Sequence, residues 1–182
     1  MKTKVTLTVC ALAVALAGAA ACRRKQTATA NNNNAASNAN ANQQAQSKEP
    51  SALPDSGFKA QITLPGAPAK LRAGERVTLA LRVRNEGGSV WPARGDTRGM
   101  FQVNAGDRWL DASGARVVND LDGRRALESD LAPGASVSLQ LDVTAPREPG
   151  EYTLEVDMIH EGVTFFREKG STPLRTRVRV GQ

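Results

Sequence analysis

The sequence MIH places His160 two residues after Met158, and it is the first pattern that could support chemistry. Side chains two residues apart share one face of a strand, and a thioether beside an imidazole suits copper. One such pair is a weak signal, because a core methionine next to a histidine at a hairpin end explains it more simply. A metal-handling periplasmic protein therefore stays open as a less favoured alternative.

His160 is the only histidine in the chain, so Ser-His-Asp and Cys-His catalysis are excluded. Carboxylates are numerous, but the sequence singles out no pair of them. No nucleophile, base and orienting group can be proposed together, and we expect the protein not to be an enzyme.

The segment NDLDGRR holds a second group of residues of types that bind metals. Its Asn119, Asp120 and Asp122 resemble part of a calcium-binding loop. Such a loop needs further oxygen ligands and a bidentate glutamate, whereas Arg124 and Arg125 add positive charge here. An Asx-rich turn is the simpler interpretation. We therefore expect no metal and no other cofactor.

Arg175, Arg177 and Arg179 alternate along LRTRVRV and so share one strand face, which could grip an anionic glycan. If this strand pairs with EYTLEVD, the outward residues opposite are the acidic Glu151, Glu155 and Asp157. Opposite charges across strands stabilise by about 0.2–1 kcal/mol per pair. Ion pairing on a two-strand surface is therefore the preferred interpretation.

The few aromatic residues are the candidates for contact with a partner. Phe165 and Phe166 are neighbours that would point to opposite faces of a strand, and Trp91 lies near a turn. Exposed rings stack on sugars or pack on proteins. Trp91, Phe165 and Phe166 are thus a candidate partner surface, with core or edge packing as the alternative, and Trp109 is assigned to the core.

The elements that must position these residues are short strands separated by Gly, Pro, Asn and Asp. RVTLALRVRN, SVSLQLDVT and EYTLEVDMI alternate between apolar and polar residues, which predicts strands with the apolar face inward. LDGRRALESDL is an exception, since its Gly and Asp content predicts a loop or one helical turn. About seven to nine strands favour an all-β antiparallel sandwich.

The block DLAPGASVSLQLDVTAPREPGEYTLEVDM resembles the E to F region of immunoglobulin-like and fibronectin type III-like domains. In that region a proline-glycine-x-tyrosine turn opens the second strand. The resemblance implies that Tyr152 is a tyrosine corner, with its hydroxyl bonded to backbone upstream. With NEGGSVWP, DRWLDASG and HEGVTFF, the chain is similar to bacterial immunoglobulin-like modules of envelope and polysaccharide-related proteins. This fold hosts many binding roles, so the resemblance says little about function.

Positions 1–21 have the parts of an export signal: basic residues, an apolar stretch and small residues before a cysteine. LAGAAACRRK resembles a bacterial lipoprotein signal, which implies that Cys22 becomes the lipid-modified first residue of the mature chain. Ala19, Ala20 and Ala21 occupy the lipobox positions, and Ala19 stands where the box usually has leucine. Ordinary secretory cleavage, which would leave Cys22 free, and an uncleaved anchor remain as alternatives.

Positions 22–54 are predicted to be a linker, because QTATANNNNAASNANANQQAQSKEP has no aromatic or branched aliphatic residue with which to build a core. The sandwich is predicted at 55–182. Neither cysteine of the chain, Cys10 or Cys22, lies in it, so it has no disulfide.

The net charge of +6 is concentrated before the folded part. Positions 55–182 hold 18 Lys and Arg against 17 Asp and Glu, which leaves no footprint for nucleic acid. We expect a non-catalytic binding or scaffolding module, lipid-anchored at the outer membrane of a bacterial envelope, with a protein or glycan ligand. An accessory or inhibitory module for a secreted enzyme is the alternative. The outer-membrane assignment rests on Arg23 after the cysteine, by analogy with sorted lipoproteins.

Overall fold

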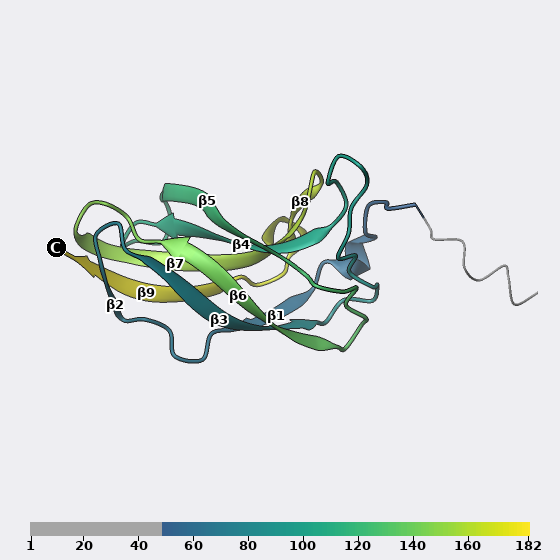
Figure 1. Ribbon diagram of the computed structural model, residues 1–182, viewed down its shortest axis with the longest axis horizontal. Helices are drawn as coiled ribbons and strands as arrows, with labels where there is room; N and C mark the ends of the chain where they lie inside the picture. Colours follow the sequence, from purple (N-terminus) through teal and green to yellow (C-terminus); the bar gives the residue numbers. More distant parts are fainter. Residues whose placement is uncertain (1–48) are drawn as a thin grey trace, which may run out of the picture. The chain divides into compact units, whose positions relative to one another are not determined.

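The computed structural model describes residues 49–182, which belong to one compact unit, Ser47–Gln182. The predicted signal peptide at 1–21, Cys22 and the linker as far as position 48 lie outside the described residues. The described part consists of β-strands and two short 3-10 helices, η1 (Asp55–Gly57) and η2 (Phe166–Lys169) (Figure 1). Neither helix is long and apolar enough to cross a membrane.

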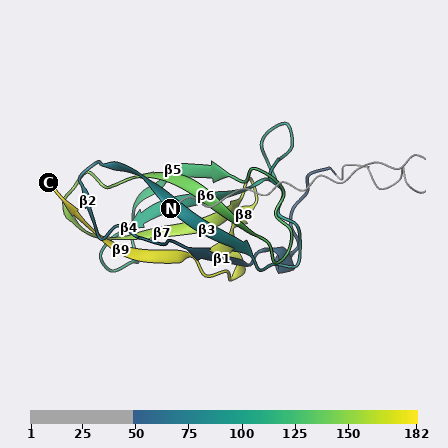
Figure 2. The same cartoon turned by 60° about the horizontal axis from the view of Figure 1, so that its bottom comes forward.

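Two sheets face each other across the core in an immunoglobulin-like β-sandwich, which confirms the predicted fold class (Figure 1). Sheet A has the strand order β1-β3-β6, and sheet B has the order β2-β9-β7-β4-β5, with β8 paired to β7. Figure 2, in which sheet A comes forward, shows β3 crossing in front of sheet B. The strands of sheet A are β1 (Ala60–Thr63), β3 (Arg76–Asn85) and β6 (Ser136–Thr144). Those of sheet B are β2 (Lys70–Arg72), β4 (Val103–Leu110), β5 (Val117–Ala126), β7 (Gly150–His160), β8 (Thr164–Phe165) and β9 (Leu174–Gly181).

The core forms where the alternating strands turn their apolar sides toward each other. In sheet A, β3 and β6 pair in register, with Leu79 opposite Leu141 and Leu81 opposite Leu139. All four side chains are buried, and their sequence neighbours on each strand are exposed. Sheet B closes the core from the other side with the buried Leu154, Val156, Met158, Val178 and Val180. The inward faces predicted for these strands are confirmed.

Tyr152 stands at the start of β7, directly after the turn APREPG. Its hydroxyl donates a hydrogen bond of 2.9 Å to the backbone oxygen of Glu148, which is the arrangement of a tyrosine corner. Its ring lies edge-on to Trp109, with the ring centroids 6.4 Å apart. The corner thereby ties the β6–β7 connection to sheet B.

β5 runs through the segment LDGRR, so the loop or helical turn predicted there is wrong. Asn119, Asp120 and Asp122 belong to this strand and not to an Asx-rich turn. Gly123 makes this possible, because a Cβ at its position would lie 2.2 Å from the Asp142 carbonyl oxygen on β6. Glycine generally disfavours strands, but here its missing side chain lets β5 approach β6 closely. Tertiary contact therefore overrides local propensity.

Candidate functional site

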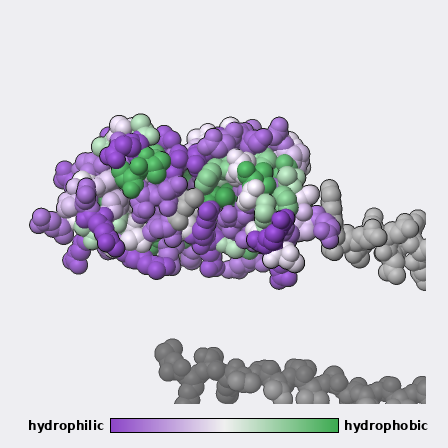
Figure 3. Space-filling view, turned by 90° about the horizontal axis from the view of Figure 1, so that it is seen from above, coloured by the Kyte–Doolittle hydropathy of each residue, from purple (hydrophilic) through white to green (hydrophobic). Residues whose placement is uncertain are grey.

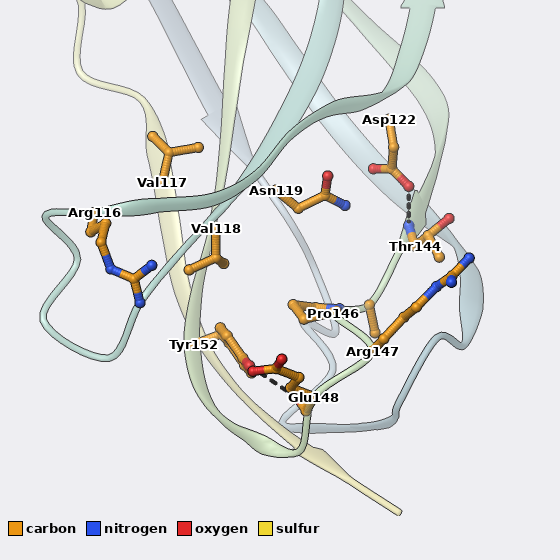
Figure 4. Close-up of a pocket in the computed structure, with 11 residues that line it drawn as sticks. Arg116, Val117, Val118, Asn119, Asp122, Thr144, Pro146, Arg147, Glu148 and Tyr152 are labelled. Carbon is orange, nitrogen blue, oxygen red and sulfur yellow. Dashed lines mark hydrogen bonds between the residues drawn. The ribbon is translucent and has the colours of Figure 1, made fainter.

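A cleft of about 680 Å³ lies between the first half of β5 and the connection from β6 to β7 (Figure 4). Arg116 and Arg147 stand on opposite sides of it in that view. The cleft is lined by Arg116, Val117, Val118, Asn119, Asp122, Thr144, Ala145, Pro146, Arg147, Glu148 and Tyr152. A cleft of this size is large enough to hold a small ligand or a segment of a partner.

The cleft combines apolar and polar groups. Val117 is an exposed valine at its edge, with 40% of its surface accessible. Two hydrogen bonds are drawn among the lining residues, Thr144 N–H to Asp122 Oδ2 at 2.9 Å and the Tyr152 corner (Figure 4). No described residue pairs with the side chains of Asn119, Arg147 or Glu148. The cleft therefore offers an amide, a cation and an anion to a ligand.

Asp107, a buried carboxyl on β4, contacts β5 next to the cleft. Its Oδ1 accepts the Gly123 N–H at 2.8 Å, while its Oδ2 has no partner that is a hydrogen-bond donor. Burial, reinforced by the neighbouring Asp122 carboxyl, raises the pKa of Asp107 to about 8. Near neutral pH Asp107 is thus protonated, and it can donate its proton to Asp122. Asp122 also accepts the Thr144 N–H through its Oδ2.

A second group of charges covers the outer face of sheet B. The Glu155 side chain is fully buried, 2.6 Å from Arg108 and 2.7 Å from Arg175. Burial acts to raise the pKa of Glu155, but the hydrogen bonds from these two guanidinium groups outweigh it and hold the pKa below its usual value. Glu155 therefore stays ionised as the centre of an ion network.

Asp157 extends the same network toward η2. Its Oδ2 accepts the Arg167 backbone N–H at 3.0 Å and lies 3.4 Å from the Arg167 guanidinium. Burial raises the pKa of Asp157 to about 6, because it outweighs the bonds from Arg167 and Met158. This carboxyl is the more weakly compensated of the two.

The predicted pairing of the arginine stripe is confirmed at two positions. Arg179 lies opposite Glu151 and Arg175 opposite Glu155, each with an ion pair. Arg177 instead lies opposite Thr153, and Asp157 lies beyond the end of the pairing with β9.

Trp91 and Phe166 do not belong to a partner surface, because both are fully buried. Their rings meet edge-on with centroids 5.0 Å apart, and the Trp91 indole N–H donates to the Gly57 oxygen at 2.8 Å. Phe166 turns inward because η2 begins there and breaks the alternation expected of strand neighbours. Phe165 stays half-buried under the Arg167 guanidinium, 3.9 Å from the ring centroid. Trp109 lies in the core.

His160 and Met158 are both fully buried. His160 Nε2 lies 3.1 Å from the Phe101 oxygen, and its ring packs against Phe58 at 5.6 Å between centroids. Burial lowers the pKa of His160, which favours the neutral ring. Within positions 49–182, no three His, Cys, Asp or Glu side chains are grouped so that they could hold a metal ion.

Sequence reasoning had named Asn119, Asp122 and Tyr152 for unrelated reasons, and the structure brings them together in the cleft. It had missed Asp107, Val117, Arg147 and Glu148. The adjacent valines of ARVVN are the one sequence feature that could have indicated the cleft. Nothing in the sequence connects Asp107 with Asp122.

The fold and cleft define an immunoglobulin-like sandwich module. No protein-family model and no curated protein matches the chain. Among solved structures, it is similar to the CARDB domain of PF1109 from Pyrococcus furiosus, at 14% identity and a TM-score of 0.40, over 67% of this chain and 92% of that one. It is also similar to a β-glucosidase from Listeria innocua, at 15% identity and a TM-score of 0.40, over 68% of this chain but only 16% of the glucosidase.

A third similar structure is the DNA glycosylase AlkC from Pseudomonas fluorescens, at 12% identity and a TM-score of 0.42, over 68% of this chain and 31% of that one. Likenesses this distant transfer no activity, ligand or site. The immunoglobulin-like assignment rests on the two-sheet strand order and on the Tyr152 bond.

Proposed function

We propose that this protein is a non-catalytic binding or scaffolding module of a bacterial envelope, with the cleft beside Tyr152 as its ligand site. The observation that carries the proposal is the set of polar side chains without partners, Asn119, Arg147 and Glu148, beside the exposed Val117. A mixture of donors, acceptors and apolar surface suits a segment of protein or a glycan.

The proposal includes a lipid anchor on Cys22 and a location at the outer membrane. It is supported by the small-residue triplet before Cys22, by Arg23 directly after it, and by the Asn-, Ala- and Gln-rich stretch that follows. A flexible tether of this composition lets an anchored module search the space beside a membrane.

The burial of the only histidine in a core aromatic cluster fits a role in binding better than a role in catalysis.

The anchor is tested by the intact mass of the protein from detergent-solubilised membranes, compared with Cys22→Ser. A diacyl or triacyl adduct on a chain that starts at Cys22, absent from the variant, is the expected result. An unmodified chain in the soluble fraction would overturn the anchor and leave a secreted module.

The ligand site is tested with the double variant Asn119→Ala, Arg147→Ala. Its matched control is Gln140→Ala, Arg94→Ala, which removes an amide and a cation from exposed positions outside the cleft. Retention on cell-wall polysaccharide and co-purification from solubilised membranes separate a glycan from a protein ligand. We expect the cleft variant to lose retention or co-purification by roughly tenfold or more, and equal behaviour of both variants would overturn the site.

A further inference from the structure

Arg82 and Arg84 form the centre of an exposed polar surface on sheet A. They point outward from β3, since Leu81 and Val83, which precede them in the alternating strand, are buried in the core. The strand register places each arginine in the middle of a row across the sheet. One row is Gln61, Arg84 and Ser136, and the other is Thr63, Arg82 and Ser138. Both guanidinium groups therefore have neutral neighbours on both sides.

Neither Arg82 nor Arg84 takes part in an ion pair with any residue that the structure describes. Lys59 adjoins Arg84 around a neighbouring hollow, where Glu86 is the acidic residue. Arg76, at the other end of the sheet, is matched by Asp142 at 3.2 Å. We call Lys59, Arg82 and Arg84, with the neutral residues of the two rows, the basic face.

The basic face is too open to enclose a small anion. The hollow between Gln61, Thr63, Arg82, Arg84 and Ser136 has a volume of about 170 Å³, and all five side chains are exposed. A planar array of guanidinium, hydroxyl and amide donors instead matches an extended surface of phosphate groups. In the described residues the chain passes through η1 into β1, the strand that bounds this face.

We propose that the basic face docks on the anionic phosphate headgroups of a membrane surface. Near such a surface each Lys or Arg contributes about fivefold to partitioning, so three of them give roughly a hundredfold, partly offset by Glu86. Alone this is weak binding. A tether raises the effective concentration of the face at the bilayer to about the millimolar range, at which weak binding becomes sufficient. The biological setting therefore rests on the proposed anchor, whereas the docking chemistry does not.

The test uses the chain from position 22 onward with Cys22→Ser, so that no lipid contributes. Its sedimentation with phosphatidylglycerol vesicles is compared with that on phosphatidylcholine vesicles at low salt. We expect the protein to bind phosphatidylglycerol vesicles and not phosphatidylcholine vesicles. The double variant Arg82→Ala, Arg84→Ala should bind phosphatidylglycerol vesicles roughly 20- to 30-fold more weakly. Arg82→Lys, Arg84→Lys should keep most of the binding, because it keeps the charge.

Arg177→Ala, Arg179→Ala is the matched control, since it removes the same charge from exposed positions on sheet B. The proposal is overturned if both double variants lose binding equally, because net charge would then be the cause. It is also overturned if the two kinds of vesicle bind equally, or if inorganic phosphate at matched ionic strength displaces the protein. If the vesicles bind as expected but the unaltered protein from membranes carries no lipid on Cys22 in the intact-mass experiment, the anchor is refuted and the docking face stands.

Discussion

The outer faces of the two sheets use arginine in opposite ways. On sheet B, Arg108 and Arg175 close over the buried Glu155, and Arg167 closes over Asp157. On sheet A, Arg82 and Arg84 alternate in the same manner but lie opposite serine, threonine and glutamine. Strand register therefore decides whether an arginine on an outer sheet face is held in an ion pair or is free to contact a partner.

The two faces also differ in what a lost charge would leave behind. Removal of the Arg82 or Arg84 guanidinium from sheet A leaves no described carboxylate without an ion-pair partner. Removal of the Glu155 carboxylate from sheet B leaves the largely buried Arg108 and the half-exposed Arg175 without their counterion.

The largest effect is expected from Glu155→Gln, which leaves Arg108 and Arg175 without their shared carboxylate. Breaking a buried ion pair on one side typically costs about 3–5 kcal/mol in the free energy of unfolding. Urea denaturation measures the change. Glu151→Gln, at an exposed pair, should cost less than about 1 kcal/mol, and equal costs would remove the distinction between buried and exposed pairs on sheet B.

The pH dependence of stability tests the second buried carboxyl of sheet B, Asp157. Its folded pKa is raised from 3.8 to about 6, so the folded state holds this proton more tightly than the unfolded state. Stability should therefore rise as the pH falls from about 6 to about 4, by up to about 1.4 kcal/mol per unit.

Asp107 adds a rise in the same direction that begins near pH 8. Glu155 acts oppositely, since its lowered pKa means that its stabilisation is lost only in more acidic solution, below its usual pKa. Asp157→Asn should roughly halve the slope between pH 4 and 6 and leave the Asp107 part above it. Urea titrations across this range measure the slope. If it is the same in Asp157→Asn as in the unaltered protein, burial does not raise the pKa of Asp157.

A smaller effect is expected from Tyr152→Phe, which removes one neutral hydrogen bond beside the cleft. Loss of the solvent-exposed bond to the Glu148 oxygen should cost about 0.5–1.5 kcal/mol in the free energy of unfolding. The midpoint of thermal unfolding measures it, and no shift would mean that the corner is dispensable. The value also shows how a neutral bond compares with the ion network of sheet B.

The smallest effect on stability is expected from Arg82→Ala, Arg84→Ala, at most about 0.5 kcal/mol, because neither side chain has a partner to lose. The same urea experiment used for Glu155→Gln measures it. Destabilisation beyond 1 kcal/mol would show that the basic face is structural after all, and would end the contrast between the two sheets.

Much of the fold could be predicted from the sequence, because period-two alternation is a direct record of which side of a strand is buried. Leu79, Leu81, Leu139 and Leu141 were assigned to the core on this basis alone and lie there. Ion pairing of the arginine stripe with the acidic face of the neighbouring strand could also be predicted, on the condition that the two strands are neighbours, and it is found for Arg175 and Arg179.

The failures lie where a residue's role depends on segments distant in sequence. Trp91 was a surface candidate, but its indole N–H finds the Gly57 oxygen, 34 residues earlier in the chain. Phe166 was placed by strand alternation that η2 interrupts. LDGRR was predicted to be irregular because Gly and Asp disfavour strands, but β4 pairs with it and Gly123 fits against β6.

The all-β class and the inward faces of the long strands could be derived from the amino-acid sequence alone. The same holds for the absence of a disulfide from 55–182 and for the choice of Cys22 as the residue to test. These features follow from local pattern and composition. Three further features depend on the tertiary structure: Asn119, Asp122 and Tyr152 share one cleft, Asp107 lies beside Asp122, and Arg82 and Arg84 have no ion-pair partner among the described residues. The reason is that strand register and sheet stacking, which set a side chain's charge environment, are properties of the whole chain and leave no mark on any single segment.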